Sequence, residues 1–278
     1  MDQTGSRGWE LGTLIHKFEA DTCPRVWLDA AQFLRGQPAR TAYNLVLAAR
    51  TPELLTPADG AIHDCVDEFL RKHAHSSVAS VASTIFPANF YMQRGAPGIY
   101  EDYPRVHPRL PRHWGMYAGR MLRKSAAADG KNRGLEFNPL RILVEKMKKQ
   151  VTGGRMRAVY ELNMIEDREL LELPIYNAIT DARCIRGQPC LSHLSFKLIS
   201  AGQKVTLTVL YRNHYYIEKA LGNLIGLAQL LCFVAAEAGV GVGPLVCHST
   251  LTELDTGSWG VGGIAELIKR CRAVNSQT

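Results

Sequence analysis

The feature that most constrains this chain is a nearly continuous apolar stretch, residues 224–236, which only Gly226 and Gln229 interrupt. The surrounding segment 219–237 is predicted to be a helix, and Gly239 follows it as an expected C-terminal cap. The stretch is well short of the roughly 20 apolar residues that cross a bilayer. Because a helix that is apolar all round is buried, the rest of the chain is expected to fold around this one.

Apolar periodicity predicts further helices and strands on both sides of this helix. The expected helices cover 25–35, 61–75 and 139–150, and the expected strands cover 42–49, 157–164, 194–199 and 205–211. The last two strands form a β-hairpin around the turn 200–203. Helices interspersed with strands predict a single α/β (α+β) domain of 278 residues, with a central mixed β-sheet flanked by helices.

Three segments are predicted to lack regular structure. Residues 86–113 contain five prolines among aromatic and arginine residues, which predicts a long loop, either a lid or a binding segment. Residues 125–134 predict a second flexible connection. The glycine-rich segment 239–243 follows a helix, whereas a dinucleotide-binding glycine motif would follow a strand, so we interpret it as a turn.

Charge and cysteine content leave several classes of function open. The net charge of +7 is compatible with nucleic acid, although a phosphate-bearing small molecule would explain it equally well. Seven cysteines without a CxxC pair predict free thiols, with neither a disulfide framework nor a zinc site. The start of the chain lacks a basic segment followed by an apolar one, so a cytoplasmic protein that binds no membrane is expected.

Cys190 is the candidate nucleophile. It directly follows a proline and directly precedes a predicted strand, a position that can expose a thiol to a cleft. The alternative for any single cysteine is a small buried apolar residue.

The residues around Cys190 resemble the thymidylate synthase family over about 65 positions, from the Pro-Cys pair through the hairpin into the long helix. The matching residues, in chain order, are Pro189, Cys190, Phe196, Gly202, Tyr211, Arg212, Leu221, Gly222 and Asn223. Upstream, residues 153–157 look like the family's phosphate-binding arginine segment, and 114–119 are similar to its Gly-x-x-Tyr-Gly segment. Glu68 lies where the family has a catalytic glutamate.

The resemblance implies a chemistry for each of these positions. Cys190 would add to C6 of a pyrimidine nucleotide and make C5 a carbon nucleophile toward a one-carbon donor. The implied catalytic residues are Cys190, Glu68 and Tyr117, and the implied substrate-binding residues are Arg155, Arg157, Arg212, Asn223 and His193. It also implies a homodimer, in which Arg155 or Arg157 reaches the partner's site, and 5,10-methylenetetrahydrofolate as the donor of a methyl or hydroxymethyl group.

The sequence also departs from the family. Leu191 stands where a histidine usually follows the nucleophile, and residues 213–216 replace the Ser-x-Asp that holds the folate pterin. No carboxylate follows there until Glu218. These departures predict a divergent member, with a role in specialised biosynthesis. The base, the sugar and the phosphate count of the substrate stay open.

Two alternatives remain. In one, the same cysteine addition proceeds without folate, for example to exchange or remove a C5 substituent. In the other, a non-catalytic dimer binds a nucleotide or nucleic acid through its positive charge, with binding that weakens steeply in salt. Tyr215 and Tyr216 would contribute to that binding surface.

Overall fold

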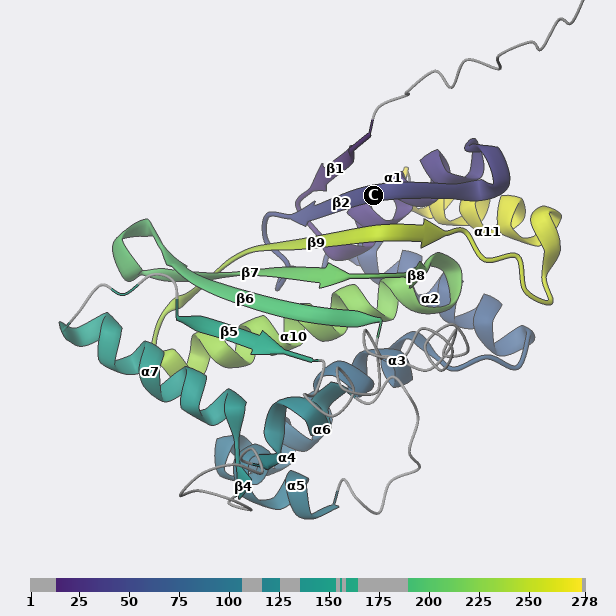
Figure 1. Cartoon of the computed structure of the whole chain (residues 1–278). Helices are drawn as coiled ribbons and strands as arrows, with labels where there is room; N and C mark the ends of the chain where they lie inside the picture. Colours follow the sequence, from purple (N-terminus) through teal and green to yellow (C-terminus); the bar gives the residue numbers. More distant parts are fainter. Residues whose placement is uncertain are drawn as a thin grey trace, which may run out of the picture.

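The computed structural model describes residues 14–106, 117–125, 136–153, 156, 159–164 and 190–276. Its centre is a mixed β-sheet in the order β1-β2-β9-β7-β6-β5, with the short β8 paired to β9 (Figure 1). The strands are β1 (His16–Ala20), β2 (Thr41–Ala49), β5 (Tyr160–Asn163), β6 (Leu191–Ile199), β7 (Lys204–Tyr211), β8 (His214–Tyr215) and β9 (Gly241–Glu253). The pairs β1–β2, β7–β9 and β8–β9 are parallel, and the other pairs are antiparallel. The predicted fold class is therefore confirmed.

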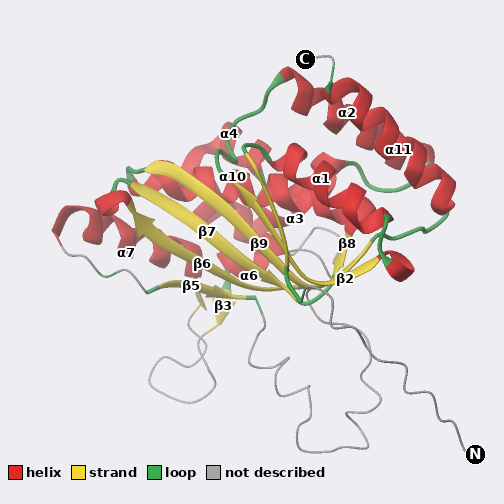
Figure 2. Cartoon of the chain, turned by 90° about the horizontal axis from the view of Figure 1, so that it is seen from above, coloured by secondary structure: helices red, strands yellow, loops and turns green. Residues whose placement is uncertain are grey.

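Helices gather on one face of this sheet (Figure 2). The helices are α1 (Cys23–Arg35), α2 (Pro57–Lys72), α3 (Val78–Ile85), α4 (Ala88–Pro97), α5 (Tyr103–Val106), α6 (Tyr117–Leu122), α7 (Pro139–Gly153), α10 (Leu221–Ala238) and α11 (Gly260–Asn275). Helices α1 and α10 pack directly on the strands, α3 packs on α10, and α2 packs on α11. Strands β3 (Lys124–Ser125) and β4 (Glu136–Phe137) form a separate small pair.

The predicted central helix is confirmed as α10, which is buried along most of its length. Gly239 ends it in a left-handed conformation with φ of 74°. A Cβ atom at Gly226 would lie 2.6 Å from the carbonyl oxygen of Ala82 in α3, so glycine is what lets the two helices approach. By length and composition, Tyr216–Ala238 is the one stretch of the described chain suited to crossing a membrane, and 72% of its tested window is buried inside the fold.

The other predicted elements are confirmed with shifted ends. Helix α2 begins four residues earlier than expected, because Thr56 and Asp59 cap it reciprocally: the Asp59 N–H donates to Thr56 Oγ1 at 3.2 Å, and the Thr56 N–H donates to Asp59 Oδ2 at 2.8 Å. Helix α1 begins two residues earlier than expected. The described part of the strand expected at 157–164 is β5, since residues 157 and 158 lie outside the described residues.

The prediction of a long loop over 86–113 is wrong for its described part. Helix α4, the helical turn Gly98–Asp102 and α5 occupy residues 88–106, whereas 107–113 lie outside the described residues, as do 126–134 of the second connection. Pro87 precedes α4, and Pro97 follows a break in α4 at Gly95, where φ is 64°. Pro104 lies in the first turn of α5. Packing against α10 stabilises the segment, through contacts of Phe86 and Tyr91 with Phe233.

The interpretation of residues 239–243 as a turn is also wrong beyond Gly239. Strand β9 begins at Gly241 and runs parallel to β7, with Lys204 opposite Gly241. A Cβ at Gly243 would lie 2.8 Å from the carbonyl oxygen of Val205, so the glycine permits close approach of the two strands. Strand β9 joins the N-terminal strands to the hairpin, and neither it nor helices α3 and α11 were predicted.

Candidate functional site

Cys190 lies half-buried at the start of β6, where β6, β7 and α6 meet. The Leu191 N–H donates to the Tyr117 hydroxyl at 3.2 Å, and the Arg212 N–H donates to the Cys190 carbonyl at 2.9 Å. Burial raises the pKa of Tyr117, so its hydroxyl stays protonated at neutral pH. The structure therefore brings together three predicted site residues, Cys190, Tyr117 and the backbone of Arg212.

A buried polar network includes Tyr211. Burial raises the pKa of Tyr211, and electrostatic interactions with Tyr117 and Cys190 raise it further. The Tyr211 ring stacks on His214 with centroids 4.3 Å apart. In turn, His214 Nε2 lies 2.9 Å from Asn223 Nδ2, and His214 Nδ1 lies 3.0 Å from Ser249 Oγ. This network ties Asn223, a predicted substrate-binding residue on α10, to the surroundings of Cys190.

Burial lowers the pKa of His214 to about 3, so the imidazole is neutral at physiological pH. A neutral imidazole donates through one nitrogen and accepts through the other. With the Asn223 amide oriented as in the structure, Nδ2 donates to His214 Nε2, and Nδ1 then donates to Ser249. The histidine thus fixes the orientation of the Asn223 amide.

Three buried polar side-chain atoms in this region have no hydrogen-bond partner within the described residues: Tyr211 Oη, Asn213 Oδ1 and Thr252 Oγ1. Tyr211 pairs with Leu191, the residue after Cys190, Asn213 follows two residues later, and Thr252 lies opposite His214 in β9. Buried polar atoms are nearly always paired in folded proteins. These three atoms therefore stand out in the segments that follow and flank the strand paired with Cys190's strand.

His193 lies on β6, opposite Asn163 of β5, and its side chain contacts Glu161 of β5. Its Nε2 is 2.8 Å from Glu161 Oε2, and Ser195 and Lys197 bind the same carboxylate. A role for His193 in substrate binding stays a prediction.

Glu68 lies on the exposed surface of α2, where its carboxylate pairs with Arg270 of α11. This pairing lowers the pKa of Glu68, so the side chain is ionised. Among the described residues its interactions are with Arg270, Arg71 and Lys72, and none joins it to Cys190. The catalytic role of Glu68 stays a prediction. Arg155 and Arg157 lie outside the described residues.

His214, Ser249 and Thr252 are the site residues that sequence reasoning missed. The only sequence signal was the replacement of the family's Ser-x-Asp by Asn213-His214-Tyr215-Tyr216. That string marked a departure, but the partners Ser249 and Thr252 come from β9, which was not predicted as a strand.

The carboxylates that follow this string do not fit a folate. The donor edge of a pterin calls for a free carboxylate that accepts two hydrogen bonds. Glu218 already lies 2.7 Å from Lys219 Nζ and 3.5 Å from His75 Nδ1. Asp255 accepts the backbone N–H groups of Ile217 and Glu218 at 2.7 and 3.2 Å. Both carboxylates therefore serve the fold. Within the described part of the chain, no cluster of three or more His, Cys, Asp or Glu side chains could hold a metal ion.

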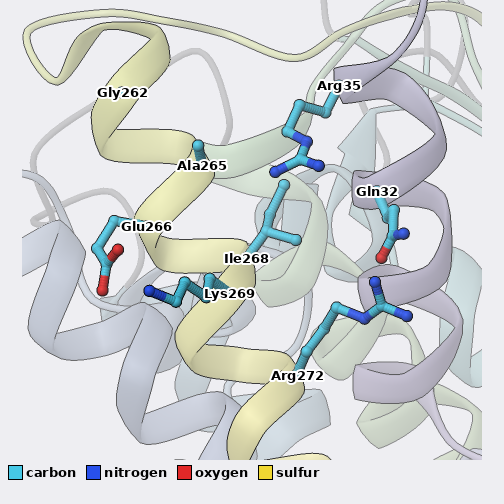
Figure 3. Close-up of a pocket in the computed structure, with 8 residues that line it drawn as sticks. All are labelled: Gln32, Arg35, Gly262, Ala265, Glu266, Ile268, Lys269 and Arg272. Atoms are coloured by element: carbon cyan, nitrogen blue, oxygen red, sulfur yellow. The ribbon is translucent and has the colours of Figure 1, made fainter.

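A separate groove of about 490 Å³ lies between α1 and α11 (Figure 3). Arg35, Lys269 and Arg272 line it, and within the described residues none of these side chains forms a hydrogen bond or an ion pair. Glu266 lies at its edge. Positive charge is thus concentrated at a place that has no residue in common with the Cys190 network.

Comparisons with known proteins concern the fold alone. Among solved structures, thymidylate synthase from T4 phage is similar over 84% of this chain and 77% of that chain, with 14% sequence identity and a TM-score of 0.43. No family model matches the sequence, and no curated protein sequence matches it.

Proposed function

We propose that the protein is a thymidylate synthase-like transferase that adds a one-carbon group, methyl or hydroxymethyl, to C5 of a pyrimidine nucleotide through a covalent Cys190 adduct. The observation that carries the proposal is the half-buried Cys190 at the start of β6, which backbone hydrogen bonds of Leu191 and Arg212 hold close to the Tyr117 hydroxyl, with the unpaired Tyr211 hydroxyl on the neighbouring strand. A planar ring with several donors and acceptors would satisfy that hydroxyl.

Four of the five other described cysteines are poor nucleophiles, and the fifth, Cys65, is buried. Burial raises the pKa of Cys247 and Cys271 to about 12, and it also raises the pKa of Cys23 and Cys232. Because the thiolate is the reactive form, these four side chains are inert near neutral pH.

In the proposed reaction, Cys190 Sγ forms a bond to ring C6 and the C5–C6 π electrons move toward C5 and the C4 oxygen. C5 then attacks the carbon of a formaldehyde-level one-carbon donor, and a base removes the C5 proton. The carrier leaves with the electron pair of its bond to that carbon, which gives a methylene group at C5. Addition of water to this group would give hydroxymethyl, and hydride from the donor's carrier would give methyl; the C6–S bond breaks with its electrons on sulfur to restore the ring. The amide of Asn223, held by His214, would pair with the ring edge, and Arg212 would bind the nucleotide phosphate. Arg155 and Arg157 are proposed for the same phosphate in a homodimer.

Glu218 and Asp255, the carboxylates that follow residues 213–216, are already paired and do not offer the free carboxylate that a folate pterin would need. This observation favours the second candidate function, in which the same Cys190 addition serves exchange or removal of a C5 substituent without folate.

The test is release of tritium from C5-labelled uracil and cytosine nucleotides, ribo and deoxy, with and without methylenetetrahydrofolate. We expect release by the natural protein and by Cys232→Ala, a matched half-buried control, and loss of release in Cys190→Ala. Dependence on folate would establish the transferase, whereas release without folate would establish the second candidate. Absence of release from every nucleotide would overturn both.

A further inference from the structure

A cavity of about 550 Å³ lies beside α10. None of its lining residues belongs to the Cys190 network. Its walls come from α10, the first turn of α1, the segment from Pro52 into α2 that includes His63, and the segment from Phe86 into α4. The volume falls within the range of about 300–1,000 Å³ that is typical of small-molecule sites. The cavity is therefore large enough for a ligand of drug-like size.

The lining is mainly apolar from the floor to the rim. Phe86, Ala228 and Phe233 are buried at its floor. At the rim, Leu54, Leu55 and Met92 are 46%, 64% and 74% exposed. Exposed apolar side chains gathered around a hollow are typical of a binding site rather than of an ordinary surface.

One carboxylate side chain, the exposed Glu53, lies at this rim. The Glu53 carboxylate forms no hydrogen bond or ion pair within the described residues, although the protein has a net charge of +7. Nearby Arg50 is engaged by Glu19 and Asp21.

The field of this carboxylate reaches into the cavity. The thiol of Cys232, in the lining, has its pKa raised first by burial and then by the charge of Glu53. At Cys23 burial dominates, and Cys247, Asp59 and Cys232 raise the pKa more than Glu53 does. An unpaired negative charge over an apolar surface favours a cation that carries its own apolar body, because burial of that body places the cation beside the carboxylate.

We propose that this cavity binds an elongated apolar cation, with its apolar body against Phe86, Ala228 and Phe233 and its ammonium group beside Glu53. The Gln229 amide also lines the cavity and can accept one of the ammonium hydrogens. The inference does not depend on the chemistry proposed for Cys190.

The test compares three probes that share one alkyl chain: decylammonium, decyl sulfonate and decanol. Each is titrated below its micelle concentration into the full chain, and heat of binding is measured. We expect decylammonium to bind about tenfold more tightly than decyl sulfonate. Glu53→Gln should remove this preference and leave decanol binding unchanged, whereas Glu266→Gln, which changes an unpaired carboxylate of the α1–α11 groove, should preserve it.

Two further variants locate the site. Ala228→Phe fills the cavity and should abolish binding of all three probes. Leu55→Lys changes an exposed rim residue that the fold does not need, and it should weaken decylammonium while strengthening decyl sulfonate. Equal affinities for the cation and the anion, or a preference that survives Glu53→Gln, would overturn the proposal. So would affinities that Leu55→Lys does not change.

Discussion

Cys190 and Cys232 are both half-buried, yet their surroundings are opposite in character. Cys190 lies at the start of β6 next to Leu191, whose N–H donates to the Tyr117 hydroxyl, and its carbonyl accepts the Arg212 N–H. Cys232 lies in an apolar cavity near the carboxylate of Glu53. Helix α10 contributes to both regions, with Asn223 near its start and Cys232 in its second half. The contrast shows that exposure alone does not define a reactive thiol. The neighbouring groups decide whether the thiol or the thiolate is stabilised, and they also decide which ligand can bind.

The largest expected effect is on stability and concerns His214, which contacts both Asn223 and Ser249. Its folded-state pKa of about 3 lies below the unfolded value of about 6.5. The unfolded state therefore binds a proton first as the pH falls, so the stabilisation is complete above about pH 6.5 and is lost toward pH 3. The loss over that interval is about 5 kcal/mol.

Denaturant unfolding of the natural protein and of His214→Gln between pH 7 and pH 4 measures this effect. The stability difference between the two proteins should shrink as the pH falls. A constant difference would mean that His214 takes up its proton over the same pH range in the folded and unfolded states.

The next effect concerns Gly226, which sets the position of the helix that both regions share. In Gly226→Ala the new Cβ would meet Ala82, whose carbonyl oxygen and Cα lie 2.6 and 3.0 Å away. Overpacking of this kind lowers the free energy of unfolding by about 1–3 kcal/mol. Displacement of α10 should also weaken probe binding in the Cys232 cavity.

Gly262→Ala is the matched control for that substitution, because Gly262 lies in α11 and nothing lies within 4 Å of its Cβ position. Alanine should stabilise the helix there by about 0.5–1 kcal/mol. Equal effects of the two substitutions, by thermal or urea unfolding, would show that α10 is free to move.

A smaller effect separates the two thiols directly. Iodoacetamide near neutral pH should modify Cys190 at least about tenfold faster than Cys232, because burial and Glu53 raise the pKa of Cys232. Mass spectrometry of the two peptides over time measures both rates in one sample. Glu53→Gln should speed modification of Cys232 and leave Cys190 unchanged. Equal rates in the natural protein would remove the contrast between the regions.

The smallest effect concerns the exposed pair Glu68–Arg270, which lies outside both regions. Arg270→Gln should lower the free energy of unfolding only slightly, since exposed ion pairs contribute little. The loss should fade as salt is added. A larger loss, or an effect of Arg270→Gln on thiol reactivity at Cys190, would show that this surface pair is coupled to the candidate site.

The sequence could predict the elements whose pattern is local. The apolar run of α10 and its glycine cap, the hairpin β6–β7, and the amphipathic helices α2 and α7 follow from spacing within one segment. Cys190 could also be singled out, because the Pro-Cys pair and the residues after it form one continuous motif. The density of prolines led to the wrong prediction of a loop at 88–106. Helix forms there because the segment packs against Phe233.

What only the tertiary structure decided depends on pairing between distant segments. Strand β9 lies between β2 and β7, so it brings Ser249 and Thr252 against His214, and no local pattern reveals that register. The cavity beside α10 likewise needs walls from four separate parts of the chain. By itself, the sequence determined which segments must be buried, because burial follows from the local spacing of apolar residues. The tertiary structure decided which polar groups meet, because those contacts depend on strand order and helix packing between residues far apart in the chain.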